Sequence, residues 1–144
     1  MIDSGKHNVV GVRVDAVDYE AAVERIISAA RQQHPLAAAA VSVHGVMISV
    51  RDKTHRYRLN NLGLVVPDGQ PGLRDRVYGP KLMFEVCRRA AAEGLPIFVF
   101  GGYSKMLKDL RRELEIKLPG IKIAGMRPAK YTAISREERD ELVE

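Results

Sequence analysis

The sequence predicts a Rossmann-like α/β fold, in which a mostly parallel sheet is covered by helices on both faces. Short apolar segments of strand length alternate along the chain with segments whose apolar residues recur every three or four positions. The length of 144 residues, of which 46% are hydrophobic and 28% charged, suits one domain spanning residues 1–144. We therefore expect a single domain in which strands and helices alternate.

The first half of the chain is expected to fold as strand, helix, strand, helix and strand. Its strands are Val-rich or uninterrupted apolar segments, as expected for strands that are covered on both faces. Asp18 is typical of a helix N-cap, and Pro35 marks the end of the same helix. In order, the predicted elements cover residues 9–14, 18–35, 36–43, 46–58 and 62–66.

The second half continues the alternation with helix, strand, helix, strand and helix. Pro80 suits the first turn of a helix, and Gly94 suits its end. Ser135, followed three residues later by Glu138, is a capping box that opens a last helix. In order, the predicted elements cover residues 80–94, 96–100, 104–118, 121–124 and 135–144.

The charge distribution predicts an anionic partner. The net charge is +5, but the last ten residues hold two arginines against five acidic residues, so residues 1–134 carry +8. Such a basic body favours phosphate, a nucleotide, nucleic acid or an acidic lipid surface. Nucleic acid is the least supported partner, because only 6% of the residues are aromatic and they do not alternate with basic ones. Lys105, Lys108 and Arg112 recur along one helix face, which we expect to be solvated and attracted to anionic lipid.

Several classes of protein are excluded by residue content. Cys87 is the single cysteine, which excludes an internal disulfide and fits a reducing, cytoplasmic setting. No apolar run approaches the ~20 residues of a membrane-spanning helix, and the first ten residues lack a signal-peptide stretch. The histidines lack metal-ligand spacing, and neither a P-loop nor a G-x-G-x-x-G motif is present. We therefore expect no metal and no cofactor.

Candidate site residues lie in the strand-to-helix turns, because ligands bind at the carboxyl ends of strands in an open parallel sheet. Asp68 follows a strand directly, where it suits either a general base or a turn-capping residue. Ser42 and His44 alternate into one turn, although His44 equally suits a capping or core position. Arg76 precedes a turn and suits either a diphosphate clamp or a solvated surface position. Gly101-Gly102 suits either a close approach of a phosphate to a helix N-terminus or an ordinary glycine-rich turn.

Several motifs occur in a fixed order and cover nearly the whole chain. They are Val41-Ser42-Val43-His44-Gly45, Arg58-Leu59-Asn60, Leu64-Val65-Val66-Pro67-Asp68-Gly69, Arg76-Val77-Tyr78-Gly79-Pro80, Phe98-Val99-Phe100-Gly101-Gly102 and Leu118-Pro119-Gly120-Ile121-Lys122-Ile123-Ala124-Gly125. This set resembles the WecG/TagA/CpsF glycosyltransferases, also called glycosyltransferase family 26. The resemblance implies inverting, metal-independent transfer of a hexose or N-acetylhexosamine from a UDP-sugar to a lipid-linked glycan precursor. It also implies a bacterial role in cell-envelope polysaccharide or exopolysaccharide synthesis, at the inner face of the cell membrane.

The resemblance implies roles for particular residues. Asp68 matches the aspartate that deprotonates the acceptor hydroxyl, and Arg76 matches the arginine that neutralises the diphosphate. The remaining matched positions are Ser42, His44, Gly69, Gln70, Tyr78 and Gly79 for the substrate, and Gly101, Gly102 and Tyr103 for the nucleotide.

The sequence departs from the family pattern in two places. Only residues 70–75 separate Asp68-Gly69 from Arg76, where the family has a helix, and the sequence stops before a Pro-Lys-Gln-Glu segment and a C-terminal membrane-docking appendage. We therefore expect a shortened family member with weak or no transferase activity, whose exposed apolar surface favours a homo-oligomer. The alternative is a non-catalytic α/β module that retains at most nucleotide binding.

Overall fold

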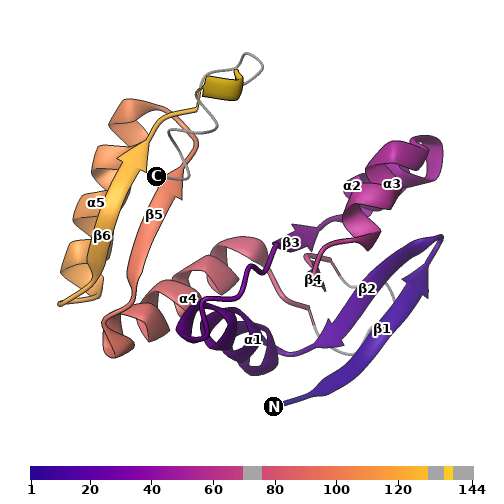
Figure 1. Cartoon of the computed structure of the whole chain (residues 1–144), viewed down its shortest axis with the longest axis horizontal. Helices are drawn as coiled ribbons and strands as arrows, with labels where there is room; N and C mark the ends of the chain where they lie inside the picture. The colour runs from indigo at the N-terminus through magenta and orange to yellow at the C-terminus, as the bar shows by residue number, and fades with distance from the viewer. Residues whose placement is uncertain (70–75, 130–134, 138–144) are drawn as a thin grey trace.

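The chain forms a mixed α/β structure, as predicted, in a computed structural model that describes residues 1–69, 76–129 and 135–137 (Figure 1). The predicted last helix lies mostly outside the described residues. The elements, in chain order, are β1 (Asp3–Val9), β2 (Val12–Val17), α1 (Tyr19–Arg31), β3 (Ala38–Val41), α2 (Val43–Arg51), α3 (Lys53–Asn60), β4 (Leu64–Pro67), α4 (Gly79–Glu93), β5 (Pro96–Phe100), α5 (Ser104–Lys117) and β6 (Lys122–Arg127).

The strands of the described residues pair two by two. β3 pairs with β4 and β5 pairs with β6 in parallel, whereas β1 and β2 form an antiparallel hairpin. The sequence predicted a single strand over residues 9–14, but the chain reverses there at Val10 and Gly11, whose φ angles are 50° and 91°. Two positive φ values are typical of a type I′ turn, in which Asn and Gly are the usual residues and valine is rare.

The predicted helix over residues 46–58 is two helices, α2 and α3, because the chain is extended at Asp52. The Asp52 carboxylate accepts hydrogen bonds from the N–H groups of Thr54 and His55 at 2.8 and 3.1 Å and so caps α3. The N–H groups of His55 and Thr54 also lower the pKa of Asp52. No helix in the described part of the chain is both long and apolar enough to cross a membrane.

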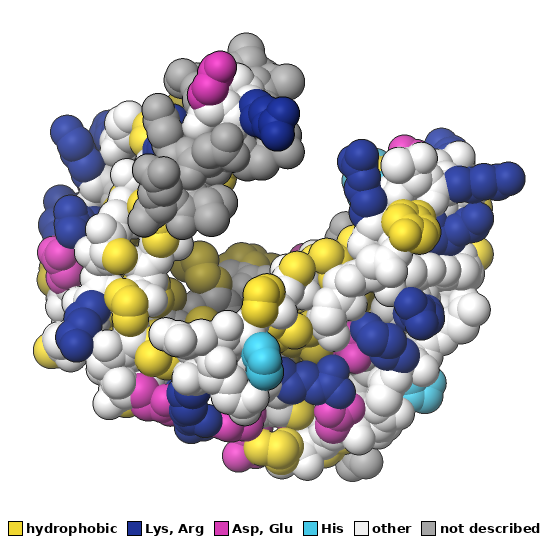
Figure 2. All heavy atoms as spheres, viewed as in Figure 1, with side chains coloured by type: hydrophobic (Ala, Val, Ile, Leu, Met, Phe, Trp, Pro, Cys, Tyr) yellow, Lys and Arg dark blue, Asp and Glu magenta, His cyan; other side chains and the backbone are white. Residues whose placement is uncertain are grey.

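Helix α4 joins the two halves of the molecule. One row of its side chains packs with α1 and with Leu64 and Val66 of β4. A neighbouring row includes Cys87, which packs with Leu114 and Leu118 near the end of α5, and burial raises the pKa of the Cys87 thiol. Between the half that contains β3 and β4 and the half that contains β5 and β6, the surface is hollowed into an open notch (Figure 2).

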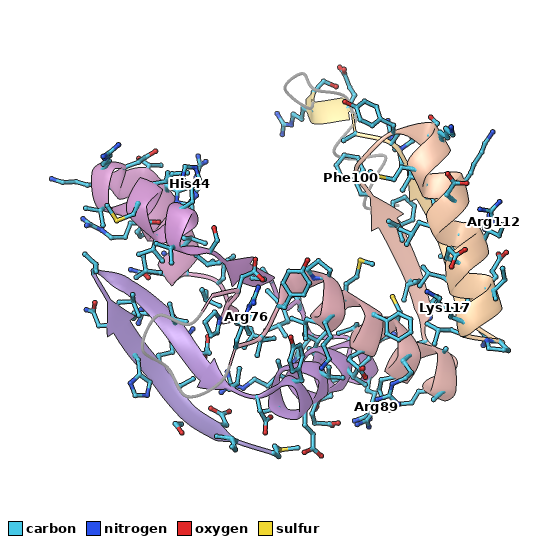
Figure 3. The ribbon with its side chains drawn as sticks, turned by 180° about the vertical axis from the view of Figure 1, so that it is seen from behind. His44, Arg76, Arg89, Phe100, Arg112 and Lys117 are labelled. Carbon is cyan, nitrogen blue, oxygen red and sulfur yellow. The ribbon has the colours of Figure 1, made fainter. Side chains whose placement is uncertain are left out.

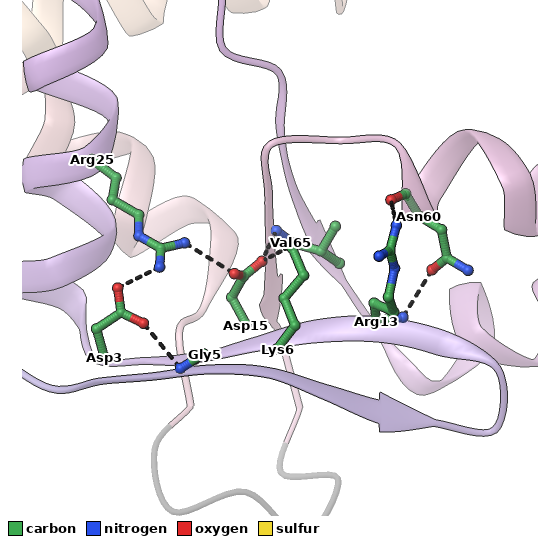
Figure 4. A network of polar contacts seen from close by, with 8 residues as sticks. All are labelled: Asp3, Gly5, Lys6, Arg13, Asp15, Arg25, Asn60 and Val65. Carbon is green, nitrogen blue, oxygen red and sulfur yellow. Dashed lines mark hydrogen bonds and ion pairs between the residues drawn. The ribbon is translucent and has the colours of Figure 1, made fainter.

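The carboxylate of Asp15 connects β2 to three other elements. Asp15 is 1% exposed, and it accepts hydrogen bonds from Lys6 Nζ of β1 at 2.8 Å and from Arg25 Nη1 of α1 at 2.9 Å (Figure 4). Its Oδ2 also accepts from the N–H of Val65 in β4 at 2.8 Å. The Asp15 side chain thus takes the hydrogen bond of the Val65 amide, which the backbone of a neighbouring strand would otherwise accept. β2 accordingly lies beside β4 without a ladder of backbone hydrogen bonds between them.

We expect Asp15→Asn to lower the free energy of unfolding by about 3 kcal/mol, because two partly buried cations would lose their buried counter-ion. Urea unfolding followed by circular dichroism measures this change. Asp109→Asn is the matched control, because the exposed Asp109 pairs with the exposed Arg112 at 3.6 Å. That control is expected to change stability by less than about 0.5 kcal/mol, and equal losses in the two variants would contradict the role of Asp15.

Candidate functional site

The carboxyl ends of β3 and β4 bring several predicted site residues to one edge. Val41 pairs with Pro67 at the ends of these parallel strands. The N–H of Asp68 donates to the carbonyl of Val41 at 3.0 Å. Ser42, which follows β3, therefore lies beside the point where Asp68 follows β4. The parallel pairing places a hydroxyl and a carboxylate at the same strand ends.

One carboxylate oxygen of Asp68 accepts a hydrogen bond, and none of the described residues bonds to the other. Its Oδ1 accepts a hydrogen bond from the N–H of Gly79, the first residue of α4, at 3.0 Å. No other described residue donates to this carboxylate. The Asp68 carboxylate thus satisfies the first amide of α4, and a capping role in the turn that follows β4 stays a prediction. It belongs to no metal-ligating cluster, since the described residues contain no group of three such side chains.

Arg76 is held beside Asp68 by the main chain. Its Nε donates to the carbonyl oxygen of Asp68 at 2.6 Å. The guanidinium carbon lies 5.0 Å from the centroid of the Tyr78 ring, which adds a cation–π contact. The N–H of Tyr78 in turn donates to the hydroxyl of Tyr19 at 2.8 Å. Tyr19 is thus part of the site, although no sequence motif singles it out.

Ser42 and His44 lie in the first turn of α2. Ser42 is the N-cap residue, and its Oγ accepts from the N–H of Gly45 at 3.3 Å. The side chain of His44 is exposed. Figure 3 shows His44 and Arg76 on the same side of the notch. The edge therefore combines one carboxylate and one guanidinium with a helix N-terminus, and His44 lies on the first turn of that helix.

The predicted substrate glycines, Gly69 and Gly79, differ in the space around them. A Cβ on Gly79 would lie 3.2 Å from the Cβ of Ala40, so a glycine lets α4 begin close to β3. A Cβ on Gly69 would lie 3.8 Å from Val43 Cγ2, which is an ordinary contact. Gln70, the remaining predicted substrate residue, lies outside the described residues.

An apolar pocket of about 360 Å³ opens beside these turns. Its walls come from the hairpin tip, from α2 and from the two strand ends. The lining residues include Val9, Val10, Ser42, Val43, Met47 and Gly69. Sequence patterns do not predict this pocket, because one of its walls is the hairpin turn at Val10, and valine is not a residue that indicates such a turn.

The turn Gly101–Tyr103 follows β5 on the opposite arm of the notch. Figure 3 shows Phe100, the residue before this turn, on the arm that faces the one carrying Arg76. Both glycines have positive φ angles, 131° and 64°, which suit glycine. The N–H of Gly101 donates to the carbonyl of Arg127 at 3.0 Å. The structure therefore places the predicted nucleotide turn apart from the Asp68 edge.

A comparison with protein families identifies the chain. The model of the family described as "Glycosyl transferase WecG/TagA/CpsF family" matches residues 7–144. The chain belongs to the WecG/TagA/CpsF family. This membership confirms the resemblance that the ordered motifs indicate. The chain is thus a member of a glycosyl transferase family of polysaccharide biosynthesis. Such transferases use a nucleotide-sugar donor and a glycan acceptor. Comparison with curated proteins gives no match.

In this WecG/TagA/CpsF family member, the capping role of Asp68 is separable from its charge. We expect Asp68→Ala to lower the free energy of unfolding by about 1 kcal/mol, because the N–H of Gly79 loses its acceptor. Asp68→Asn retains an acceptor oxygen and is expected to stay close to wild type. Urea unfolding of the two variants measures the difference, and an equally large loss for Asp68→Asn would show that the charge itself stabilises the fold.

Proposed function

We propose that this protein transfers a hexose or N-acetylhexosamine from a UDP-sugar to a lipid-linked glycan precursor at the inner face of a bacterial cell membrane, with inversion at the anomeric carbon. The observation that carries the proposal is the pairing at the Asp68 edge: a carboxylate of which one oxygen has no partner among the described residues, and a guanidinium held against the carbonyl of the same residue at 2.6 Å. Family membership supports the transferase class.

In the proposed reaction, Asp68 acts as general base. Its second carboxylate oxygen takes the proton of the acceptor hydroxyl, and the hydroxyl oxygen attacks the anomeric carbon of the donor sugar. The bond from that carbon to the diphosphate breaks as the new bond forms, and the electron pair leaves with UDP. Arg76 faces the negative charge that develops on the departing diphosphate. This chemistry moves one proton and needs no external oxidant or reductant.

The other predicted residues line the donor and acceptor in this proposal. Ser42 and His44 offer polar groups in the first turn of α2, whose free N–H groups favour an anion. The Gly101–Tyr103 turn is proposed to contact the nucleotide. Its position across the notch implies that the donor spans the two arms.

One observation favours an alternative function, a nucleotide-binding module without transferase activity. Figure 3 shows Phe100, which precedes the Gly101–Tyr103 turn, on one arm of the notch, whereas Arg76, which is bonded to Asp68, lies in the other half of the molecule. In that arrangement either arm could bind an anion while the reacting groups stay apart. Binding and turnover must therefore be measured separately.

Donor binding is tested by the melting temperature of the full chain with millimolar UDP and UDP-glucose. We expect both ligands to raise the melting temperature, since a ligand that binds only the native state stabilises it. Arg76→Gln is expected to weaken UDP binding by at least about tenfold, because a charge-assisted hydrogen bond is lost. Arg112→Gln, at an exposed position of α5, is the matched control and should bind UDP like wild type. Absence of any shift in the wild-type protein would contradict the proposal.

Catalysis is tested by UDP release from UDP-glucose and UDP-N-acetylglucosamine, with a farnesyl-diphosphate-linked N-acetylhexosamine as acceptor. We expect slow release by wild type and a loss of about 100-fold or more in Asp68→Asn, which lacks the base. The variant should keep its UDP-dependent melting shift. UDP binding without release in wild type would favour the non-catalytic module.

A further inference from the structure

The tip of the β1–β2 hairpin and one row of α2 expose apolar side chains. Val10 is 66% exposed, Val43 61% and Met47 45%. Val43 and Met47 lie one helical turn apart on α2, and all three residues line the apolar pocket described above. We call Val10, Val43 and Met47 the apolar tip. Single exposed apolar residues are common, but a group that continues into an apolar pocket is typical of an interaction site.

Positive charge surrounds the apolar tip. Residues 43–60, which form α2 and α3, contain Arg51, Lys53, Arg56 and Arg58 but only one acidic residue, Asp52. The Asp52 carboxylate is already used to cap α3. Figure 2 shows dark-blue basic side chains beside a yellow apolar patch at the end of the molecule where Figure 1 places α2 and α3. This charge complements an anionic partner.

The apolar tip and the basic helices form one structural unit. At the end of α3, the Asn60 Oδ1 accepts from the N–H of Arg13 at 2.8 Å (Figure 4). The Nδ2 of Asn60 donates to the carbonyl of Gly11 at 2.9 Å. The hairpin turn also contains strain, because Val10 is a β-branched residue at a φ of 50°. The turn thus presents an apolar side chain to the surface where Asn or Gly would suit the backbone better.

We propose that the apolar tip and the basic side chains of α2 and α3 form the face that lies on an anionic lipid bilayer. The apolar tip enters the boundary between headgroups and acyl chains, and the Arg and Lys side chains contact lipid phosphates. Tyr57, which is 72% exposed on α3, is an aromatic residue of the kind that lies at membrane interfaces. The pocket reaches Ser42 and Gly69, so, if the proposed function holds, a lipid-borne hydroxyl approaches Asp68 from the bilayer.

Helix α5 is the competing basic face, since Lys105, Lys108 and Arg112 form a row on it. Acidic residues of the same helix offset its charge: Arg112 lies 3.6 Å from Asp109, and Lys117 lies 3.6 Å from Glu113. Its attraction to an anionic surface is therefore weaker than that of α2 and α3. This row supplies a matched control for charge.

Sedimentation of the full chain with lipid vesicles tests the proposal. We expect binding to phosphatidylcholine vesicles that contain phosphatidylglycerol, and we expect salt to weaken it. The triple variant Arg51→Gln, Lys53→Gln, Arg58→Gln should bind about 100-fold more weakly, because each cation near an anionic surface contributes about fivefold.

The matched triple variant Lys105→Gln, Lys108→Gln, Arg112→Gln should lose less than about fivefold, because its charges lie away from the bilayer. Circular dichroism verifies the folding of both triple variants. Equal losses in the two, or no binding of wild type to the phosphatidylglycerol vesicles, would overturn the proposal.

A single substitution tests the apolar part independently of charge. Val10→Asn suits the type I′ turn, so the fold should be retained or stabilised. We expect it to weaken vesicle binding by about tenfold, because each carbon of the valine side chain that enters the apolar part of the bilayer adds to the free energy of binding. Unchanged vesicle binding in this variant would exclude insertion of the apolar tip.

The vesicle experiments and the UDP experiments fail independently. Vesicle binding with no UDP-dependent melting shift would remove the proposed transferase function and leave the membrane face in place. A UDP-dependent melting shift with no vesicle binding would remove the proposed membrane face and leave the proposed donor binding in place. Neither measurement requires turnover.

Discussion

The buried carboxylate of Asp15 is the interaction on which the arrangement of the first half of the protein depends. It holds a cation from β1, a cation from α1 and a backbone amide of β4 at once. A charge in the interior is tolerated only when it is paired and hydrogen-bonded, so these partners must meet at one point. The hairpin, α1 and β4 are thereby fixed relative to one another, and with them the edge at which Asp68 follows β4.

From this fixed half, α4 extends the structure toward the second half. Its first amide is capped by Asp68, its middle packs on α1, and Cys87 packs on the end of α5. The start of α4 is therefore tied to the same residue that is proposed to act as base. A change in the position of α4 would shift Asp68, and the β5–β6 arm would move with the helix.

The sequence predicted those parts of the structure that depend on local patterns. The α/β class, the Asp18 cap and the Gly94 helix end follow from periodicity and capping chemistry, and the structure confirms them. The sequence does not indicate the hairpin turn at Val10, because valine is rare at positive φ. It does not indicate the break between α2 and α3 either, because a single aspartate inside a helical pattern does not by itself mark an N-cap. The Asp15 network links residues 50 positions apart, which no local pattern reveals. Parallel pairing accounts for the closeness of Ser42 and Asp68, whereas their chemical roles and that of the Gly101–Tyr103 turn stay predictions.

Arg76 is attached to the carbonyl of Asp68 and not to its carboxylate. Protonation of the Asp68 side chain would therefore leave the hydrogen bond from Arg76 intact, because the backbone carbonyl oxygen accepts whether or not the carboxylate is protonated. A hydrogen bond from the guanidinium to the carboxylate itself would instead be weakened when that carboxylate takes up a proton. In the proposed reaction, the Asp68 carboxylate takes up a proton while the hydrogen bond that positions Arg76 is unchanged.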